Sequence, residues 1–353
     1  MEKKEPTKKS PLKKIILIFL FILLLAGLAA GSLIYRALFR PNIVLHGKNS
    51  GYLYIPTGSD FNAVLNILNK HSFLRDPGTF TSVALWKKYP EKVKPGRYRL
   101  RKGMNNNELV NLLRAGKQEP VDLVFHNIRT KQDLAGKISR QIEADSTSLI
   151  HLLNDDNYLR NFGTGPACAF TLFIPNTYEF FWNTSADQFI RRMAEEQKKF
   201  WSGSRTEKAK RSGMEISSVV ILASIVEKET SRDREKPVIA GVYLNRLKKG
   251  WPLQADPTLI FAWNDYSIRR VLNKHKEINS PYNTYLHTGL PPGPICLPSV
   301  ASIDAVLDHA THEYMYFCAK EDLSGYHNFA VTLDEHNRNA ARYQAALKKL
   351  NIH

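Results

Sequence analysis

The fold of this chain is organised around its most apolar segment outside the N-terminal region, Val219-Val220-Ile221-Leu222-Ala223-Ser224-Ile225-Val226-Glu227-Lys228-Glu229-Thr230. Eight consecutive residues without a charge predict a buried helix over residues 216–229 that ends in two carboxylates. Side chains two positions apart on a helix point about 200° apart, so Glu227 and Glu229 cannot act side by side on one face.

The helical neighbours of the two glutamates differ. Those of Glu229 are Leu222, Ile225 and Val226, all apolar, whereas those of Glu227 are smaller and partly polar. A carboxyl group on an apolar face loses its water, so we expect its pKa to rise to about 6, where it can donate a proton near neutrality. We therefore predict Glu229 as a general acid and keep Glu227 as the alternative second acid. The competing interpretation is that both are ordinary exposed charges where the helix reaches the surface.

A polar cluster follows this helix. It contains Asn245 and Arg246, and then Gln254, Asp256 and Thr258 in alternation. An extended segment would present the three alternating side chains on one side, as hydrogen-bonding groups in a row that suit a sugar polymer. Asp-Pro is also a common turn, which is the plain alternative for this segment.

Aromatic residues and an amide lie further along, in Ser280-Pro281-Tyr282-Asn283-Thr284-Tyr285. Side chains of this kind stack on and bind carbohydrate, so Tyr282, Asn283 and Tyr285 are candidate substrate-binding residues. The alternative is a solvated loop with tyrosines tucked into the core. Residues 281–298 contain five prolines, too many for regular structure, and long ordered loops are often functional.

Residues 15–35 contain no charge and are long enough to cross a hydrocarbon core of about 30 Å. The positive-inside rule places the N-terminus in the cytoplasm and the rest of the chain outside, because six lysines precede the run: Lys3, Lys4, Lys8, Lys9, Lys13 and Lys14. A signal peptide cleaved near Ala30 is the alternative, but its apolar region would be shorter, about 7–15 residues. We predict an uncleaved single-pass anchor.

The 353 residues carry a net charge of +17, which suits an anionic partner such as a membrane surface or an acidic wall polymer. No basic block is interleaved with aromatics, so nucleic acid is not an expected partner. His309, His312 and Glu313 fit neither common zinc pattern, and we expect no metal. Cys168, Cys296 and Cys318 form no C-x-x-C, and we expect three buried thiols, with a Cys296–Cys318 bridge as the alternative.

The pattern of elements predicts an α+β fold. We expect a cytoplasmic tail (1–14), a transmembrane helix (15–35), a connector (36–49), a small α+β module (50–118) and a larger mixed region (119–353). In the module, strands are predicted at 52–55 and 97–100, with a helix capped by Ser59 between them. In the larger region, we expect a strand over 121–125 and one charged, exposed helix over 191–210.

Five ordered motifs resemble the YceG-like endolytic murein transglycosylases. They are Lys94-Pro95-Gly96-Arg97-Tyr98, Phe173-Ile174-Pro175-Asn176-Thr177-Tyr178, Ala223 to Thr230 as quoted above, Leu253-Gln254-Ala255-Asp256-Pro257-Thr258, and Ser280 to Tyr285 followed by Gly289-Leu290-Pro291-Pro292-Gly293-Pro294-Ile295. The resemblance implies a LysM-like subdomain over 50–118, a catalytic domain over 119–353, a catalytic Glu229 and substrate contacts that include Tyr178. The family often has Asp where this chain has Asn176, which puts a charge-dependent role there in doubt.

The reaction that the resemblance implies is non-hydrolytic cleavage between N-acetylmuramic acid and N-acetylglucosamine within a strand, without metal or organic cofactor. One glutamate would suffice, because the muramyl 6-hydroxyl is an internal nucleophile. Expected partners are peptidoglycan glycan strands, the cytoplasmic membrane and peptidoglycan synthases. Two alternatives stay open: a non-catalytic wall-binding scaffold, and a true hydrolase with Asp256 as second carboxylate.

Overall fold

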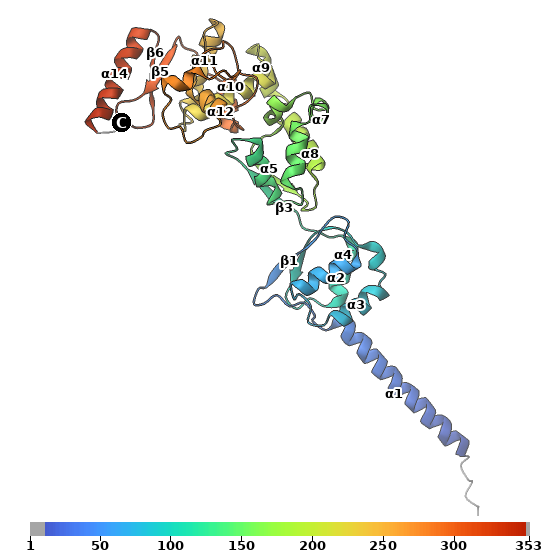
Figure 1. Ribbon diagram of the computed structural model, residues 1–353. Coiled ribbons are helices and arrows are strands. Elements are labelled where there is room, and N and C mark those ends of the chain that lie inside the picture. The colour runs from blue at the N-terminus through green and yellow to red at the C-terminus, as the bar shows by residue number, and fades with distance from the viewer. Residues whose placement is uncertain (1–10, 351–353) are drawn as a thin grey trace, which may run out of the picture. The chain divides into compact units, whose positions relative to one another are not determined.

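The computed structural model describes residues 11–350 and has a mixed α/β architecture (Figure 1). The chain divides into two compact units: unit 1, Met1–Val121 with Phe181–Asn183, and unit 2, Asp122–Phe180 with Thr184–His353. In the described part of the chain, the six strands form three two-stranded sheets, β1-β2, β3-β4 and β5-β6. The expectation of helices mixed with short strands is confirmed.

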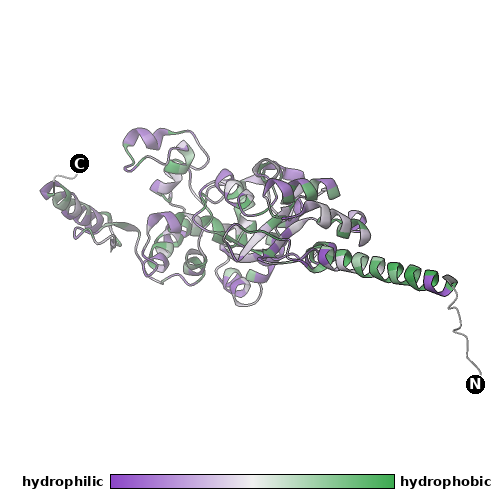
Figure 2. Ribbon diagram, turned by 90° about the horizontal axis from the view of Figure 1, so that it is seen from below, coloured by the Kyte–Doolittle hydropathy of each residue, from purple (hydrophilic) through white to green (hydrophobic). Residues whose placement is uncertain are grey.

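Helix α1 (Pro11–Phe39) is apolar along almost its whole length (Figure 2). Residues Leu12–Phe39 make it long and apolar enough to cross a membrane, and its large side chains are exposed. These properties are consistent with a single-pass anchor. Of the lysines used to predict its orientation, Lys13 and Lys14 are on the helix, whereas Lys3, Lys4, Lys8 and Lys9 lie outside the described residues.

Unit 1 continues directly from α1. Its elements are β1 (Ser50–Ile55), α2 (Phe61–Lys70), α3 (Pro77–Trp86), η1 (Pro90–Lys92), β2 (Gly96–Arg101) and α4 (Asn106–Ala115). β1 and β2 pair antiparallel, with Ser50 opposite Arg101 and Ile55 opposite Gly96. Alternate residues of both strands face the helices, which buries Leu53, Tyr98 and Leu100 with the apolar faces of α2 and α4. Both strands that we predicted in this module are confirmed.

The helix starts in unit 1 are set by side-chain caps. Asp60 caps α2 by accepting a hydrogen bond from the Ala63 amide at 2.7 Å, so the predicted cap at Ser59 is wrong by one residue. Asn105 and Glu108 form a reciprocal capping box at the start of α4, and Gly116 ends that helix in a left-handed conformation. Each carboxylate or amide oxygen satisfies a backbone N–H that has no partner inside its helix.

Unit 2 holds the remaining elements, apart from the first residue of β3. They are β3 (Val121–Phe125), α5 (Lys131–Ser139), α6 (Ser146–Asn154), α7 (Asp156–Arg160), η2 (Pro166–Leu172), β4 (Asn176–Phe180), α8 (Ala186–Phe200), α9 (Ser204–Arg211), α10 (Ile216–Glu229), α11 (Lys236–Lys248), α12 (Asp256–Trp263), η3 (Asn273–Glu277), α13 (Val300–Leu307), β5 (Tyr316–Ala319), β6 (His327–Ala330) and α14 (Leu333–Lys349). The predicted limits of β3 and α10 are confirmed. The single exposed helix expected over residues 191–210 is wrong, because Gly203, at φ +70°, separates α8 from α9 and Phe189, Ile190 and Met193 bury one face of α8.

Helix α10 forms the centre of unit 2, as the opening segment of the sequence analysis predicts. Val219 to Val226 are all buried, and α9, α11, α12 and α13 pack around the helix. The buried Ser224 hydroxyl donates to the Ile221 carbonyl at 2.7 Å and accepts from the Ile295 amide at 3.0 Å. This pair of bonds attaches the proline-rich loop 281–298 to the helix that carries the glutamates.

Candidate active site

Glu229 lies at the C-terminal end of α10 and is half-buried. Its Oε1 accepts a hydrogen bond from the Tyr243 hydroxyl of α11. Loss of water around the carboxyl raises its pKa to about 7, and the nearby charge of Asp256 acts in the same direction. Tyr243 and the positive charge of Arg246 oppose the rise, because both stabilise the carboxylate. Near neutral pH, this group therefore has comparable protonated and ionised populations.

Glu227 has the opposite environment. Its Oε2 accepts hydrogen bonds from the Ser299 hydroxyl at 2.6 Å, from Ser302 and from the Lys236 ammonium at 3.1 Å. Although burial favours its neutral form, these three donors hold the pKa of Glu227 below its usual value. The carboxylate thus connects α10 to α11 and to the first turn of α13. The two glutamates have different hydrogen-bond partners, although both line one pocket.

Helix α11 supplies groups that fix the surroundings of Glu229. Arg246 donates from Nε to the Met315 carbonyl at 2.8 Å and from Nη1 to the Leu253 carbonyl at 2.6 Å. Asn245 donates its amide hydrogens to two carbonyl oxygens of the chain that leads into β5, those of His312 and Tyr314. Both predicted substrate-binding side chains therefore hold neighbouring backbone in place.

The extended segment expected at residues 253–258 is wrong. Gln254 has a left-handed backbone (φ +51°), and α12 begins at Asp256 with Pro257 in its first turn, where proline needs no N–H partner. Thr258 is fully buried and bonds the Ala255 carbonyl and the Thr284 hydroxyl, at 2.7 and 2.8 Å. Gln254 and Asp256 stay exposed, so the three side chains do not form a row.

The loop after α12 brings Tyr285 to Asp256, whose carboxylate accepts the tyrosine hydroxyl proton in a hydrogen bond. Asn283 is fully buried and donates to the carbonyls of Lys276 and Ile278 at 2.8 and 2.9 Å, so it shapes the loop. Tyr282 packs its ring on Phe261 of α12, with centroids 4.7 Å apart. Of the three predicted loop residues, Tyr282 and Tyr285 are the ones that line the surface beside α12.

Tyr178 lies in an aromatic core. Its ring stacks on Phe125 at 5.8 Å, and its hydroxyl donates to the Ile174 carbonyl at 2.8 Å. This bond joins the two halves of the Phe173 to Tyr178 motif across the start of β4. We place Tyr178 among the residues that support the fold of unit 2.

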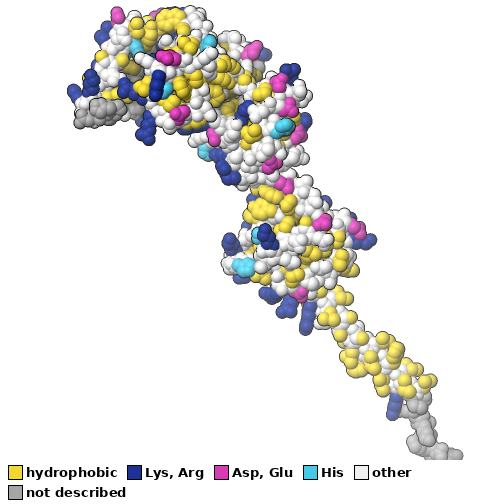
Figure 3. Space-filling view, in the orientation of Figure 1, with side chains coloured by type: hydrophobic (Ala, Val, Ile, Leu, Met, Phe, Trp, Pro, Cys, Tyr) yellow, Lys and Arg dark blue, Asp and Glu magenta, His cyan; other side chains and the backbone are white. Residues whose placement is uncertain are grey.

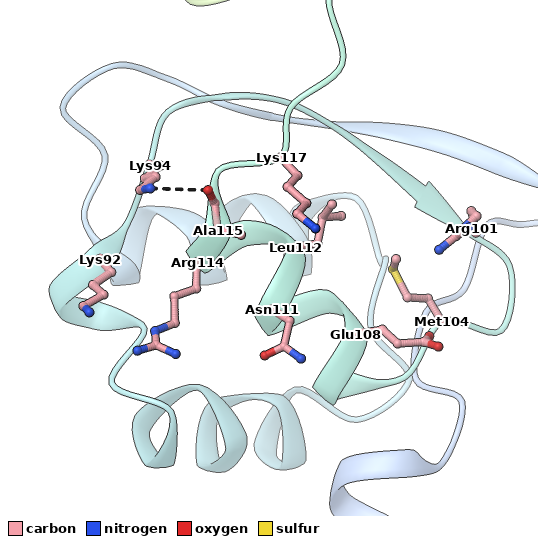
Figure 4. A pocket seen from close by; sticks show the side chains of 10 residues that line it. All are labelled: Lys92, Lys94, Arg101, Met104, Glu108, Asn111, Leu112, Arg114, Ala115 and Lys117. Atoms are coloured by element: carbon pink, nitrogen blue, oxygen red, sulfur yellow. Dashed lines mark hydrogen bonds between the residues drawn. The ribbon is translucent and has the colours of Figure 1, made fainter.

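A pocket of about 480 Å³ opens beside Glu229, and its lining includes Glu227, Lys228, Thr230 and Ser299. A second pocket, of about 690 Å³, lies in unit 1 between α4 and β2 (Figure 4). Five basic residues line it: Lys92, Lys94, Arg101, Arg114 and Lys117. Its one carboxylate, Glu108, belongs to the capping box of α4. The carboxyl group whose pKa is raised, Glu229, lies in unit 2.

Comparison with known proteins gives the same family as the motifs. The sequence model of the YceG-like family matches residues 53–342. The chain belongs to the YceG-like family. The endolytic murein transglycosylase of Bacillus subtilis (strain 168) is 29% identical over 333 residues, which cover 89% of this chain and 90% of that protein.

Two further proteins are similar to most of this chain. The endolytic murein transglycosylase of Streptococcus pneumoniae serotype 2 (strain D39) is 25% identical over 360 residues, covering 92% of this chain and 64% of that protein. The crystal structure of a YceG-like protein from Listeria monocytogenes is 26% identical, with a TM-score of 0.55, and covers 83% of this chain and 99% of that chain.

One residue of this YceG-like site, Tyr243, is absent from the sequence-based prediction. It follows Glu229 by 14 positions and lies on another helix, so helical spacing gives no sign of the contact. Burial, together with the charge of Glu229, raises the pKa of Tyr243 well above its usual value and keeps it a hydrogen-bond donor. The signal available in the sequence was a tyrosine three positions before Arg246, on the face of α11 that meets α10.

Proposed function

We propose that this protein is an endolytic murein transglycosylase in which Glu229 is the single catalytic acid and base. The observation that carries the proposal is the pKa of about 7 at Glu229, in a pocket of the unit that bears four of the five family motifs. A catalytic acid and base works best when its pKa is close to the working pH. Family membership and relatives named as endolytic murein transglycosylases support the same reaction.

In the proposed reaction, protonated Glu229 donates its proton to the glycosidic oxygen between N-acetylmuramic acid and N-acetylglucosamine. The C1–O bond breaks, and the carboxylate that remains accepts the proton of the muramyl 6-hydroxyl as that oxygen bonds to C1. The products are a 1,6-anhydro end and a free 4-hydroxyl, with no water consumed. Glu229 ends protonated, ready for another turnover.

Tyr243 would position this group during the cycle. Its hydroxyl binds Oε1, which leaves Oε2 free to carry the proton. Because a hydrogen bond of this kind favours the ionised form, it makes Glu229 a stronger acid than burial alone would allow. Arg246 adds positive charge and holds the backbone carbonyls of Leu253 and Met315.

Glu227 is unsuited to the role of second acid, because three donors hold it ionised. Asp256 is the remaining carboxylate near Glu229, and a hydrolase would use it to activate water. Such an enzyme would leave reducing ends, so the products separate the two reactions.

We further propose that residues 50–118 form a LysM-like subdomain and residues 119–353 the catalytic domain. With α1 crossing the cytoplasmic membrane and its lysine-rich end inside, both would work on the outer side of that membrane. There the enzyme would act during wall elongation or strand termination, beside the peptidoglycan synthases that supply its substrate.

The decisive experiment digests purified glycan strands with the detergent-solubilised full chain and analyses the products by mass spectrometry. We expect 1,6-anhydro ends at internal cuts. Glu229→Gln keeps the size of the side chain but cannot donate a carboxylic proton, and the rate should fall by about 10²–10⁴ or more. Glu227→Gln is the matched control and should retain the chemistry. Reducing ends would refute the transglycosylase reaction, and full activity of Glu229→Gln would refute the assignment.

A further inference from the structure

The pocket beside Glu229 is the first of three in unit 2 that share lining residues. Lys228 lines that pocket and also a smaller one of about 190 Å³. Arg129, Phe261 and Tyr266 line the smaller pocket and also a third, of about 490 Å³. We call the second and third pockets together the side groove.

Helix α12 runs along the side groove. The charge of Asp256, its first residue, acts on Glu229, and Pro257 and Phe261 line the smaller pocket. Phe261 and Asn264, the residue after the helix end, line the third pocket. At 1.5 Å per residue, α12 covers about 12 Å. The side groove therefore starts next to the acid and leads away from it along a rigid wall.

Two cations face this groove without a carboxylate partner among residues 11–350. Arg129 and Lys228 are both exposed, and neither forms an ion pair in that part of the chain. Both cations line the smaller pocket, so they lie near the same part of the groove.

The other charged groups at the groove already have partners. Lys131 lines the third pocket, but its ammonium donates to the carbonyls of Leu153 and Pro166 and to Asn154. Asp133 lies near Tyr266, but its carboxylate accepts from the Thr130 amide at 3.0 Å in the cap of α5. The groups left for a ligand are therefore Arg129 and Lys228.

The walls between these cations are aromatic. The Arg129 guanidinium lies over the Tyr266 ring, 5.2 Å from its centroid, and Phe261 packs against Tyr282. The loop that closes the third pocket approaches η2 so closely that a Cβ on Gly293 would lie 2.0 Å from the Ala167 carbonyl oxygen. The groove thus joins a rigid apolar surface to two cations, a combination that suits an anionic ligand with aliphatic parts.

We propose that the side groove binds the peptide stem that muramic acid carries, with Arg129 and Lys228 pairing with a stem carboxylate. This inference rests on the proposed function. The stem leaves through the lactyl group on O3 of the same sugar ring whose C1–O bond is cut, so it must pass out of the site on one side. When that lactyl group is an amide, the sugars are uncharged and the stem carries the negative charge. A groove beside the acid, with two cations that form no ion pair within residues 11–350, matches such a chain.

The test compares two substrates with the full-length enzyme in detergent: strands that carry peptide stems, and the same strands stripped by an amidase. The quantity measured is the ratio of kcat/KM for stem-bearing over stripped strands. Arg129→Gln and Lys228→Gln should each lower this ratio roughly 3- to 30-fold, the range for loss of a charge-assisted contact at a partly exposed site. Lys228→Arg should restore most of it.

Lys198→Gln, which removes an exposed cation of α8, is the control and should leave the ratio unchanged. Raising the salt concentration should lower the ratio for the unmodified enzyme more than for the two variants. An unchanged ratio in Arg129→Gln and Lys228→Gln would overturn the inference, as would a loss confined to stripped strands. Absence of product from both substrates with the unmodified enzyme would instead refute the proposed function.

Discussion

Replacement of Tyr243 by Phe tests how the acid is tuned. The change removes one hydroxyl from a buried ring and leaves its packing against Phe317 in place. A hydrogen bond to a charged group contributes about 1.5–3 kcal/mol, and 1.36 kcal/mol corresponds to one pH unit. Because the bond favours the carboxylate, its loss should raise the pKa of Glu229 from about 7 to roughly 8–9.

The pH dependence of kcat/KM on glycan strands reports this change. Catalysis starts from protonated Glu229, so activity should be flat at low pH and fall above the pKa of the free enzyme. At pH 9 the unmodified enzyme should retain about 1% of its plateau, whereas Tyr243→Phe should retain roughly 10–50% of its own.

Tyr285→Phe is the matched control, since that hydroxyl binds Asp256 instead, and its midpoint should stay near that of the unmodified enzyme. A midpoint that stays near 7 or falls in Tyr243→Phe would refute the role of the tyrosine. If the residual activity of Glu229→Gln fell with pH at the same midpoint as that of the unmodified enzyme, the role of Glu229 as the acid would be refuted.

Two further predictions concern stability. Glu227→Gln should lower the free energy of unfolding by about 2–3 kcal/mol, because it leaves Asp233 as the one carboxylate partner of the buried Lys236. Chemical denaturation measures this change, and an unchanged free energy of unfolding would contradict the structural role of Glu227. Glu229 has a folded pKa of about 7 against 4.5 in the unfolded chain, so its contribution is fully present below pH 4.5 and is lost as the pH rises to 7. Relative to Glu229→Gln, the free energy of unfolding of the unmodified protein should therefore fall by at most about 3 kcal/mol between pH 4.5 and 8. Solvent screening of the half-buried carboxyl makes the fall smaller. If the free energies of unfolding of the two proteins changed in parallel with pH, the raised pKa would be contradicted.

The sequence allowed the central helix and the difference between its two glutamates to be predicted. Continuous burial of residues 219–226 and the 3.6-residue period give the two carboxyls different neighbours along the helix. The small sheet of unit 1 could also be predicted, because apolar and polar residues alternate in its strands and turn residues bound them.

The rest depended on contacts between distant segments. Asp256-Pro257 reads as a turn from local chemistry, yet the same pair starts α12 once Thr258 can bond Thr284 in the core. Asn283 and Arg246 have the donors of sugar-binding residues, but buried carbonyls of other segments take those donors. A single sequence cannot show which polar side chains find partners inside the fold.

The junction between α1 and unit 1 has a consequence for how the enzyme meets its substrate. The buried Asn106 donates to the Ala37 carbonyl in the last turns of α1 at 2.9 Å, and Asn42 bonds Asn106 and the Asp76 backbone just beyond the helix end. On the face that Figure 3 shows, Lys and Arg side chains gather on one side of this end of unit 1. These hydrogen bonds fix the end of α1 to unit 1, so the connection does not behave as a flexible linker. A protein inserted through α1 would thus carry unit 1 against the bilayer, and its search for strands would become diffusion in two dimensions, governed by the surface density of the enzyme.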